Sequence, residues 1–336
     1  MSDTVFEVRE LVKVFGRGRR ASSRPAVDGV TFDVRRGEAL GIVGESGSGK
    51  TTVGRILIGM ETATSGEVLF EGQSVVSGGR RVRAALRRTV QMVFQNPFSS
   101  LNPFRTIRSA LDDGLARAGV ARGDRDAAMA QLMDQVGLTE AMLDRYPHEF
   151  SGGQRQRVVL ARALTVSPKV LVADEPVSAL DVSIQAQVLN LLGELKKRLQ
   201  LTIVFVTHDL RVVNFFCDRI AVMYMGRLVE LGTRAQIMDE SRHPYTRMLL
   251  SAAPNDQPGH SVERPWVRQE LDASAPATAG CNFAARCWAR QALGNPERCI
   301  TDRPSEAVRD DGRVVACHFE EQIPDLAAES SARTGA

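Results

Sequence analysis

The sequence lacks any long run of apolar residues, and this absence argues against a helix that spans a membrane. Such a helix needs roughly 20 apolar residues in succession, with about 18 as the usual lower bound. No run of that length occurs among the 336 residues. The first residues also lack the basic and apolar regions of a signal peptide. We therefore expect a protein that is made and kept in the cytosol.

Strong net charge is missing as well, and cysteine is rare before residue 281. The formal net charge of +3 is too small to indicate a nucleic-acid partner. Cys217 stands alone, whereas four cysteines crowd the last part of the chain: Cys281, Cys287, Cys299 and Cys317. In a reducing compartment, such crowding indicates a bound metal more than disulfide bonds.

What the sequence does contain is a glycine-rich segment with the spacing of a P-loop. Residues 44–51 have the required order of Gly, four residues, Gly-Lys and then Ser or Thr. The apolar residues before it predict a buried strand, and those after it predict a helix. Backbone N–H groups of such a loop hold phosphate, the lysine reaches the β- and γ-phosphates, and the hydroxyl holds Mg²⁺. The predicted nucleotide-binding residues are Gly44, Glu45, Ser46, Gly47, Ser48, Gly49, Lys50, Thr51 and Thr52.

Two further apolar segments predict strands at the core of a parallel sheet. Residues 170–173 and 201–206 are continuous runs of mainly Val, Ile and Leu, typical of strands covered on both faces. Alternating segments at residues 4–14 and 30–34 predict an antiparallel β flank. Residues 107–143 have a helical pattern, which predicts a helical insertion. The expected fold class is therefore α/β.

The composition predicts two domains with a boundary near residue 242. Beyond that point Pro, Ala, Ser and Arg become frequent, and the clustered cysteines lie there. We predict a P-loop NTPase domain in residues 1–241, with a helical subdomain at about 97–165. Residues 242–336 would form a small C-terminal domain that contains the cysteines.

Two acidic residues, Asp174 and Glu175, follow the first of the two buried strands. In parallel sheets, ligands bind beyond the carboxyl ends of the strands. We expect Asp174 to hold Mg²⁺, directly or through water, and Glu175 to orient or deprotonate the attacking water. Paired acids after a strand also occur in solvated turns, but the P-loop upstream favours the catalytic interpretation.

A second glycine-containing segment, Ser151-Gly152-Gly153-Gln154-Arg155, precedes an apolar helix. Ser151 and Gln154 have the spacing of a capping box, which alone would make the segment a well-capped structural helix. The exposed N–H groups and bare glycines would also form a phosphate cradle. One chain with two cradles suggests that the second serves the nucleotide of a partner subunit.

Together with Gln95, residues 178–181 and His208, these motifs stand in the order found in ABC-transporter ATPase subunits, which the chain resembles over residues 1 to about 240. The resemblance implies a head-to-tail dimer, with ATP between the P-loop of one subunit and the 151–155 segment of the other. It also implies that Gln95 senses Mg²⁺ and the water, and that His208 lies near the γ-phosphate. Phe15 is the candidate aromatic that stacks on adenine, although a place in the core is the alternative for that side chain.

A narrower resemblance links four segments to the ATPases of oligopeptide/dipeptide importers, the F-type more than the D-type of the two paired subunits. The segments are residues 96–103, 146–151, 243–246 and 280–287. The resemblance implies that ATP hydrolysis drives uptake of di- and oligopeptides. The implied partners are a second ATPase subunit, two membrane permease subunits and an extracytoplasmic solute-binding protein, with no nucleic acid. The implied location is the cytoplasmic face of the cell (inner) membrane, as a peripheral subunit.

The four tail cysteines are where the same resemblance implies a cofactor. Some members of the family carry a 4Fe–4S cluster on such cysteines, and four thiolates are what a cluster needs. Zinc sites usually have two closely spaced cysteine pairs, whereas the gaps here are five, eleven and seventeen residues. We therefore expect a 4Fe–4S cluster in a region that contributes no group to ATP chemistry. Zinc and unligated thiols stay open as alternatives.

Other functions fit the sequence less well. ABC ATPases that act on DNA or the ribosome place coiled coils or zinc insertions between the P-loop and the second cradle, and the interval of about one hundred residues here has no heptads. A P-loop kinase for small molecules would leave residues 151–155 and His208 unexplained. Within transport, nickel, glutathione or another solute stays open, because the solute never touches this subunit.

Overall fold

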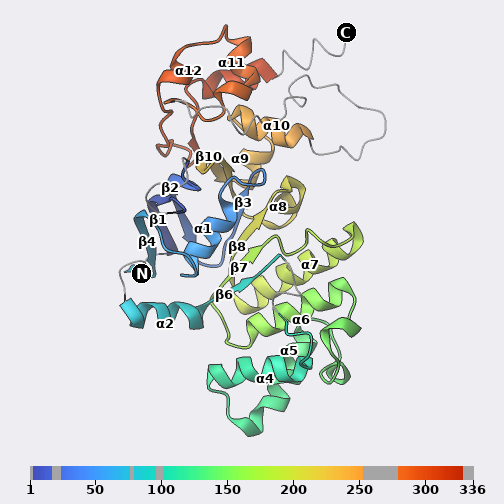
Figure 1. The fold of residues 1–336 in the computed structure, drawn as a ribbon. Coiled ribbons are helices and arrows are strands. Elements are labelled where there is room, and N and C mark those ends of the chain that lie inside the picture. Colours follow the sequence, from blue (N-terminus) through green and yellow to red (C-terminus); the bar gives the residue numbers. More distant parts are fainter. Residues whose placement is uncertain (1–2, 17–23, 76–78, 96–100, 253–278, 328–336) are drawn as a thin grey trace. The chain divides into compact units, whose positions relative to one another are not determined.

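The computed structural model describes five ranges of the chain (Figure 1): 3–16, 24–75, 79–95, 101–252 and 279–327. The described chain divides into two compact units. Unit 1 comprises Met1–Arg9, Phe32–Leu40 and Thr51–Thr207. Unit 2 comprises Glu10–Thr31, Gly41–Lys50 and His208–Ala336. Residues 96–100, which contribute to the resemblance with peptide importers, lie outside the described residues.

Unit 1 contains the predicted parallel strands. Strand β7 (Val170–Asp174) pairs in parallel with β8 (Thr202–Thr207) on one side and with β6 (Val90–Val93) on the other. Every residue of β7 and β8 is buried, as the continuous apolar runs predicted. Because all three strands run the same way, their carboxyl ends meet at one edge of the sheet. The residues that follow these strands are therefore brought close together.

The predicted antiparallel flank is present as a sheet of order β2-β1-β4-β5. Its strands are β1 (Thr4–Lys13), β2 (Val27–Arg35), β4 (Ser65–Phe70) and β5 (Gln73–Ser74). Strand β4 pairs antiparallel with β5. Strands β1 and β2 alternate between buried and more exposed residues, the pattern of a sheet with one face on a core. The division between the units falls within β1, β2 and β3 (Ala39–Val43).

The helices of unit 1 include the predicted helical insertion. In chain order the helices are α1 (Lys50–Leu57, whose first residue is in unit 2), α2 (Gly79–Thr89), α4 (Ile107–Ala118), α5 (Arg125–Gln135), α6 (Gly152–Leu164) and α7 (Val182–Leu199). Helices α4, α5 and α6 pack on one another (Figure 1). Helix α4 starts at the N-cap Thr106, whose hydroxyl accepts a hydrogen bond from the Ser109 N–H, and ends at Gly119 in the left-handed region.

Unit 2 contains three antiparallel strands near the end of the chain. Strand β9 (Arg219–Tyr224) and strand β10 (Arg227–Thr233) form a hairpin, and β10 also pairs with β11 (Val314–Val315) from the end of the chain. Both turn residues of the hairpin, Met225 and Gly226, have positive φ, as in a type I′ turn. The helices of unit 2 are α8 (Leu210–Phe216), α9 (Arg234–Met238), α10 (Pro244–Ala252), α11 (Trp288–Ala292) and α12 (Arg298–Thr301).

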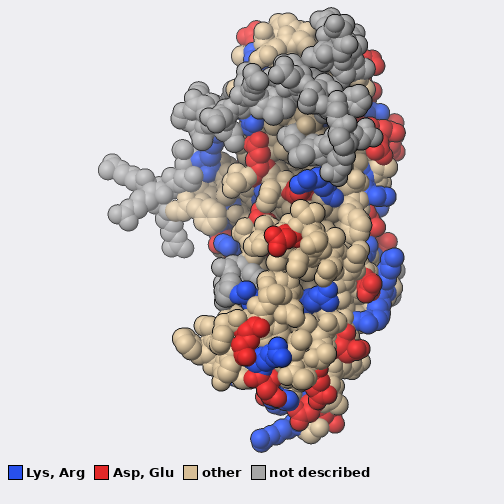
Figure 2. Space-filling view, turned by 90° about the vertical axis from the view of Figure 1, so that its right-hand side faces the viewer, with Lys and Arg blue, Asp and Glu red and all other residues tan. Residues whose placement is uncertain are grey.

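Two surface properties agree with the composition. None of the helices in the described ranges combines the length and the apolar character that a membrane crossing requires. On the face that Figure 2 shows, basic and acidic side chains are interspersed over the described surface, in keeping with a net charge of +3.

Candidate nucleotide-binding site

The P-loop has the predicted strand, loop and helix order, from β3 to α1. Gly47 and Gly49 both have positive φ, which favours glycine. The loop also passes very close to neighbouring backbone. A Cβ atom on Gly44 would lie 2.1 Å from the Met223 carbonyl oxygen, and one on Gly49 would lie 2.2 Å from the Ala26 carbonyl oxygen. Packing therefore requires glycine at 44 and 49, and the positive φ of Gly49 favours glycine there by conformation as well.

Lys50 is held by oxygens of its own loop. Its Nζ donates to the Gly44 carbonyl at 2.7 Å, to the Glu45 carbonyl at 2.8 Å and to Ser48 Oγ at 3.2 Å. Only 5% of the residue is exposed. The Ser48 carbonyl in turn accepts from the Gly226 N–H at 3.0 Å, at the turn of the β9–β10 hairpin. The loop thus carries a buried, fixed ammonium beside a helix start, an arrangement suited to phosphate oxygens.

In unit 1, two of the three residues predicted to hold or sense Mg²⁺, Thr51 and Asp174, are in contact. The Thr51 hydroxyl, in the first turn of α1, donates to Asp174 Oδ1 at 2.9 Å. Asp174 is the last residue of β7 and is 5% exposed. A hydroxyl and a carboxylate oxygen are donors of the kind that Mg²⁺ prefers. The donor set therefore fits the ion that the P-loop motif implies.

The second predicted acid is in contact with Gln95. The Gln95 side-chain N–H donates to Glu175 Oε2 at 2.8 Å. Gln95 follows β6 and Glu175 follows β7, so the shared edge of the parallel sheet explains their meeting. Glu175 has a φ of 46°, which is uncommon for a residue with a side chain and is associated with functional sites. Its N–H donates to the Val206 carbonyl of β8 at 2.8 Å, which holds this conformation.

The predicted second cradle is an exposed helix start. Ser151 is the N-cap of α6, and both hydrogen bonds of the capping box with Gln154 are present. A Cβ on Gly153 would lie 2.5 Å from Ile184 Cγ2, and one on Gly152 would lie 3.1 Å from Leu180 Cδ2. The glycines therefore let the start of α6 pack against residues 180–184. Ser151 itself is exposed.

The two remaining predicted residues lie in unit 2. His208 directly follows β8 and is exposed. The Phe15 ring is 44% exposed, and Lys13 Nζ lies 5.0 Å from its centroid. Phe15 is therefore at the surface, and a place in the core, the alternative for this side chain, does not apply.

Two residues that touch the P-loop were missed by the sequence analysis, because they lie far along the chain. Arg286 donates two hydrogen bonds to the Glu45 carboxylate, at 3.0 and 3.2 Å. The Tyr245 hydroxyl accepts from the Glu45 N–H at 3.0 Å. Both belong to the C-terminal segment, which we expected to stand apart from ATP chemistry. Segments 243–246 and 280–287 resemble those of peptide importers, but no local pattern in the sequence connects them with Glu45.

Comparison with known proteins identifies the family. Residues 27–178 match the sequence model described as ABC transporter, and residues 229–293 match that of the oligopeptide/dipeptide transporter C-terminal region. The oligopeptide transport ATP-binding protein AppF of Bacillus subtilis is 42% identical over 94% of this chain and 98% of its own. The chain belongs to the ATP-binding subunits of the oligopeptide/dipeptide ABC transporter family. The dipeptide transport ATP-binding protein DppF of Haemophilus influenzae is 44% identical over 87% of this chain and 88% of its own.

Solved structures confirm the expected fold class. CbiO1 of Clostridium perfringens, part of the ABC transporter complex cbiONQ, has a TM-score of 0.65 and 29% identity over 71% of this chain and 92% of its own. The ATP-binding cassette MJ0796, in a dimeric post-hydrolysis state bound to ADP and Pi, has a TM-score of 0.60 and 28% identity over 68% of this chain and 98% of its own. The chain is thus an ABC-type ATPase, as the motifs predicted.

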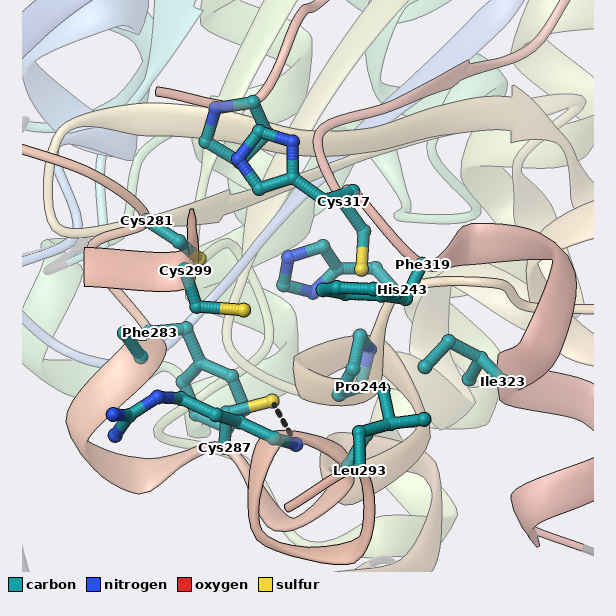
Figure 3. Close-up of a pocket in the computed structure, with 15 residues that line it drawn as sticks. His243, Pro244, Cys281, Phe283, Cys287, Leu293, Cys299, Cys317, Phe319 and Ile323 are labelled. Carbon is teal, nitrogen blue, oxygen red and sulfur yellow. Dashed lines mark hydrogen bonds between the residues drawn. The ribbon is translucent and has the colours of Figure 1, made fainter. Parts of the chain in front are cut away.

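The expected 4Fe–4S cluster, by contrast, is a wrong prediction. Among the described residues, which include all four tail cysteines, no group of three or more His, Cys, Asp or Glu side chains is placed to hold a metal ion. The cysteines surround a cavity of about 20 Å³ that has an almost wholly apolar lining, with Phe283, Leu293 and Ile323 among its walls (Figure 3). The two relatives are described simply as transport ATP-binding proteins.

The apolar surroundings of these thiols give a physical reason why the prediction of a 4Fe–4S cluster is wrong. Burial raises the pKa of Cys287 to about 12, and it raises the pKa of Cys281 and of Cys317 as well. Metal ligation needs thiolates, which this apolar setting disfavours. Cys287 and Cys317 instead pack against a small core of Trp288, Ala289 and Ile323. Their role in this structure is that of apolar packing residues.

Proposed function

We propose that this chain hydrolyses ATP to drive uptake of di- and oligopeptides through partner permease subunits. The match of residues 229–293 to the oligopeptide/dipeptide transporter C-terminal region carries the proposal for the solute class. The descriptions of the relatives from Bacillus subtilis and Haemophilus influenzae support it. The proposed location is the cytoplasmic face of the cell membrane, where the chain binds permeases as a peripheral subunit. Uptake of nickel or glutathione is the alternative.

The proposed chemistry follows from the two side-chain pairs in unit 1. Thr51 and Asp174 would hold Mg²⁺, with Gln95 close to the ion, and Lys50 with the P-loop backbone would bind the phosphates. When bound, Mg²⁺ neutralises charge on the β- and γ-phosphates. Glu175 orients the water and accepts its proton, and the hydrogen bond from Gln95 fixes the carboxylate that does so.

The remaining predicted residues also have proposed roles. His208 would contact the γ-phosphate, and Phe15 would stack on adenine. The exposed start of α6, with Ser151, Gly152, Gly153 and Gln154, would face the nucleotide of a second ATPase subunit in a head-to-tail heterodimer. The proposed domains are an ATPase domain of residues 1–241, with a helical subdomain at about 97–165, and a transporter-specific domain of residues 242–336.

A groove in unit 1 supports contact with a permease. The groove has a volume of about 610 Å³ and combines apolar and basic walls, which include Met92, Phe94, Arg87, Arg88, Arg117 and Arg162. Burial, and after it the nearby Arg117, lower the pKa of Arg162, so positive charge is crowded there. The charge suits an amphipathic segment with acidic residues. Phe94 directly precedes Gln95, so a segment bound in the groove would shift Gln95 and alter its hydrogen bond with Glu175.

The test is uptake by proteoliposomes that contain this chain with the proposed partners: two permease subunits, a second ATPase subunit and a solute-binding protein. Labelled di- and oligopeptides, Ni²⁺ and glutathione are supplied in parallel with internal ATP. The proposal expects peptide uptake, whereas uptake of Ni²⁺ or glutathione alone would overturn the solute class. Arg88→Glu should weaken assembly with the permeases, while Arg122→Glu, an exposed residue outside the groove, should leave it intact.

A further inference from the structure

We propose that the C-terminal segment sets the geometry and the charge of the P-loop, with Arg286 and Tyr245 as positioning residues for ATP binding. All the contacts that carry this proposal lie within unit 2. They converge on a single P-loop residue, Glu45, through its side chain, its N–H and its carbonyl oxygen.

The side chain of Glu45 is held by a two-pronged ion pair. Arg286 Nη1 donates to Oε2 at 3.0 Å and Nη2 donates to Oε1 at 3.2 Å. The two side chains are only 14% and 26% exposed, so solvent screens the pair less than a surface salt bridge. The guanidinium also lies 5.8 Å from the Tyr224 ring centroid and 5.9 Å from that of Phe283. Its position is therefore defined by packing as well as by charge.

The main chain of Glu45 is held from both sides. Its N–H donates to the Tyr245 hydroxyl at 3.0 Å, and its carbonyl accepts from Lys50 Nζ at 2.8 Å. Tyr245 is fully buried, and its ring packs against Tyr224 at 4.6 Å and Phe283 at 5.4 Å between centroids. One residue thus links the C-terminal segment to the lysine that binds phosphate. Movement of Arg286 or Tyr245 would move the carbonyl that positions Lys50.

Charge gives Arg286 a second effect. ATP brings negative phosphates to the P-loop, and a carboxylate within that loop repels them unless it is neutralised. Arg286 supplies the neutralising charge. Loss of Arg286 would leave the Glu45 carboxylate half-buried and unneutralised beside the phosphates. Removal of the carboxylate as well would relieve the repulsion, and a merely structural role for Arg286 does not predict this relief.

The two positioning residues are tied to each other through the C-terminal core. Arg286 ends the short turn Ala284–Arg286, which is preceded by the buried Phe283. Trp288, two residues further on, donates its indole N–H to the Pro244 carbonyl at 3.1 Å, next to Tyr245. The apolar core lined by the cysteines therefore holds Arg286 and Tyr245 in one rigid arrangement against the P-loop.

The test is a double-mutant cycle on ATP affinity, measured with the full chain and a fluorescent ATP analogue. Arg286→Met should raise the Kd about tenfold, which corresponds to ~1.4 kcal/mol of binding free energy. Tyr245→Phe, which loses one hydrogen bond, should raise it about threefold. The double variant Arg286→Met with Glu45→Gln should bind at least about fivefold more tightly than Arg286→Met alone. In steady-state hydrolysis, Arg286→Met should raise KM and change kcat by less than about twofold.

The matched control is Arg309→Met, which breaks another ion pair of the C-terminal segment. Arg309 Nε donates to Glu320 Oε1 at 2.7 Å, and the side chains are 30% and 13% exposed. The Arg309→Met variant should have lower thermal stability than wild type and an unchanged Kd for ATP. Equal effects of Arg286→Met and Arg309→Met on Kd, or no relief by Glu45→Gln, would overturn the proposal. If Arg286→Met does not fold, Arg286→Lys and the double variant decide, because neither leaves an unneutralised carboxylate. ATP binding is measured without permeases, so the outcome is independent of the solute transported.

Discussion

Glu175→Gln is expected to bind ATP with near-normal affinity and to hydrolyse it very slowly. The amide has the size of the carboxylate, and its oxygen can still accept the hydrogen bond that Gln95 donates at 2.8 Å. One neutral hydrogen bond replaces one to a charged group, so stability should change by less than about 1.5 kcal/mol. The amide cannot accept a proton from water. Since general-base catalysis contributes about 10²–10⁴ in rate, turnover should fall at least about a hundredfold.

The assay measures phosphate release under saturating ATP, together with nucleotide binding and the mass of the complex. ATP that is bound and not hydrolysed should trap a dimer if, as proposed, the 151–155 segment of a second subunit completes each site. Glu194→Gln is the control, since Glu194 is exposed on α7 and should keep turnover within about twofold of wild type. Turnover of Glu175→Gln near the wild-type rate would remove Glu175 from the role of base.

Three further variants test separate parts of the structure. Thr51→Ala should weaken Mg²⁺-dependent ATP binding, and Thr51→Ser, which keeps the hydroxyl that contacts Asp174, should restore it in the same titration. Gly44→Ala should lower the free energy of unfolding by about 3 kcal/mol or more, because the new Cβ would meet the Met223 carbonyl. The control is Gly193→Ala, whose Cβ would meet nothing within 4 Å. This control should raise the free energy of unfolding, and urea unfolding measures both variants. Glu230 is buried, which raises its pKa from 4.5 to about 7. Between these pH values the folded protein retains a proton that the unfolded chain loses, so rising pH destabilises the folded wild type relative to Glu230→Gln. The free energy of unfolding of wild type minus that of Glu230→Gln should therefore fall as pH rises from about 4.5 to 7. A difference that does not change with pH would contradict the burial of an ionisable Glu230.

Local pattern predicted much of the fold and the local structure around the candidate site residues. The P-loop, the buried strands β7 and β8 and the capping box of Ser151 and Gln154 depend on residues close in sequence, whose spacing determines strand, turn and helix. The meeting of Gln95 with Glu175 follows from one further rule, that parallel strands bring their carboxyl ends to one edge.

Contacts between distant segments could not be predicted in this way. Glu45 and Arg286 are 241 residues apart, and no periodicity relates them. The cysteines were misinterpreted for a related reason. Their spacing is the same whether the thiols ligate a metal or pack in a core, and the apolar surroundings that raise the pKa of Cys287 arise only in the folded chain.

The most direct test of the account measures ATP hydrolysis and peptide uptake together in the same proteoliposomes. With wild-type chain, addition of peptide and binding protein should stimulate hydrolysis and give uptake in proportion to the phosphate released. With Glu175→Gln at this subunit, both should fall together. Peptide uptake that continues while hydrolysis by this chain is abolished would contradict the claim that the chain drives transport.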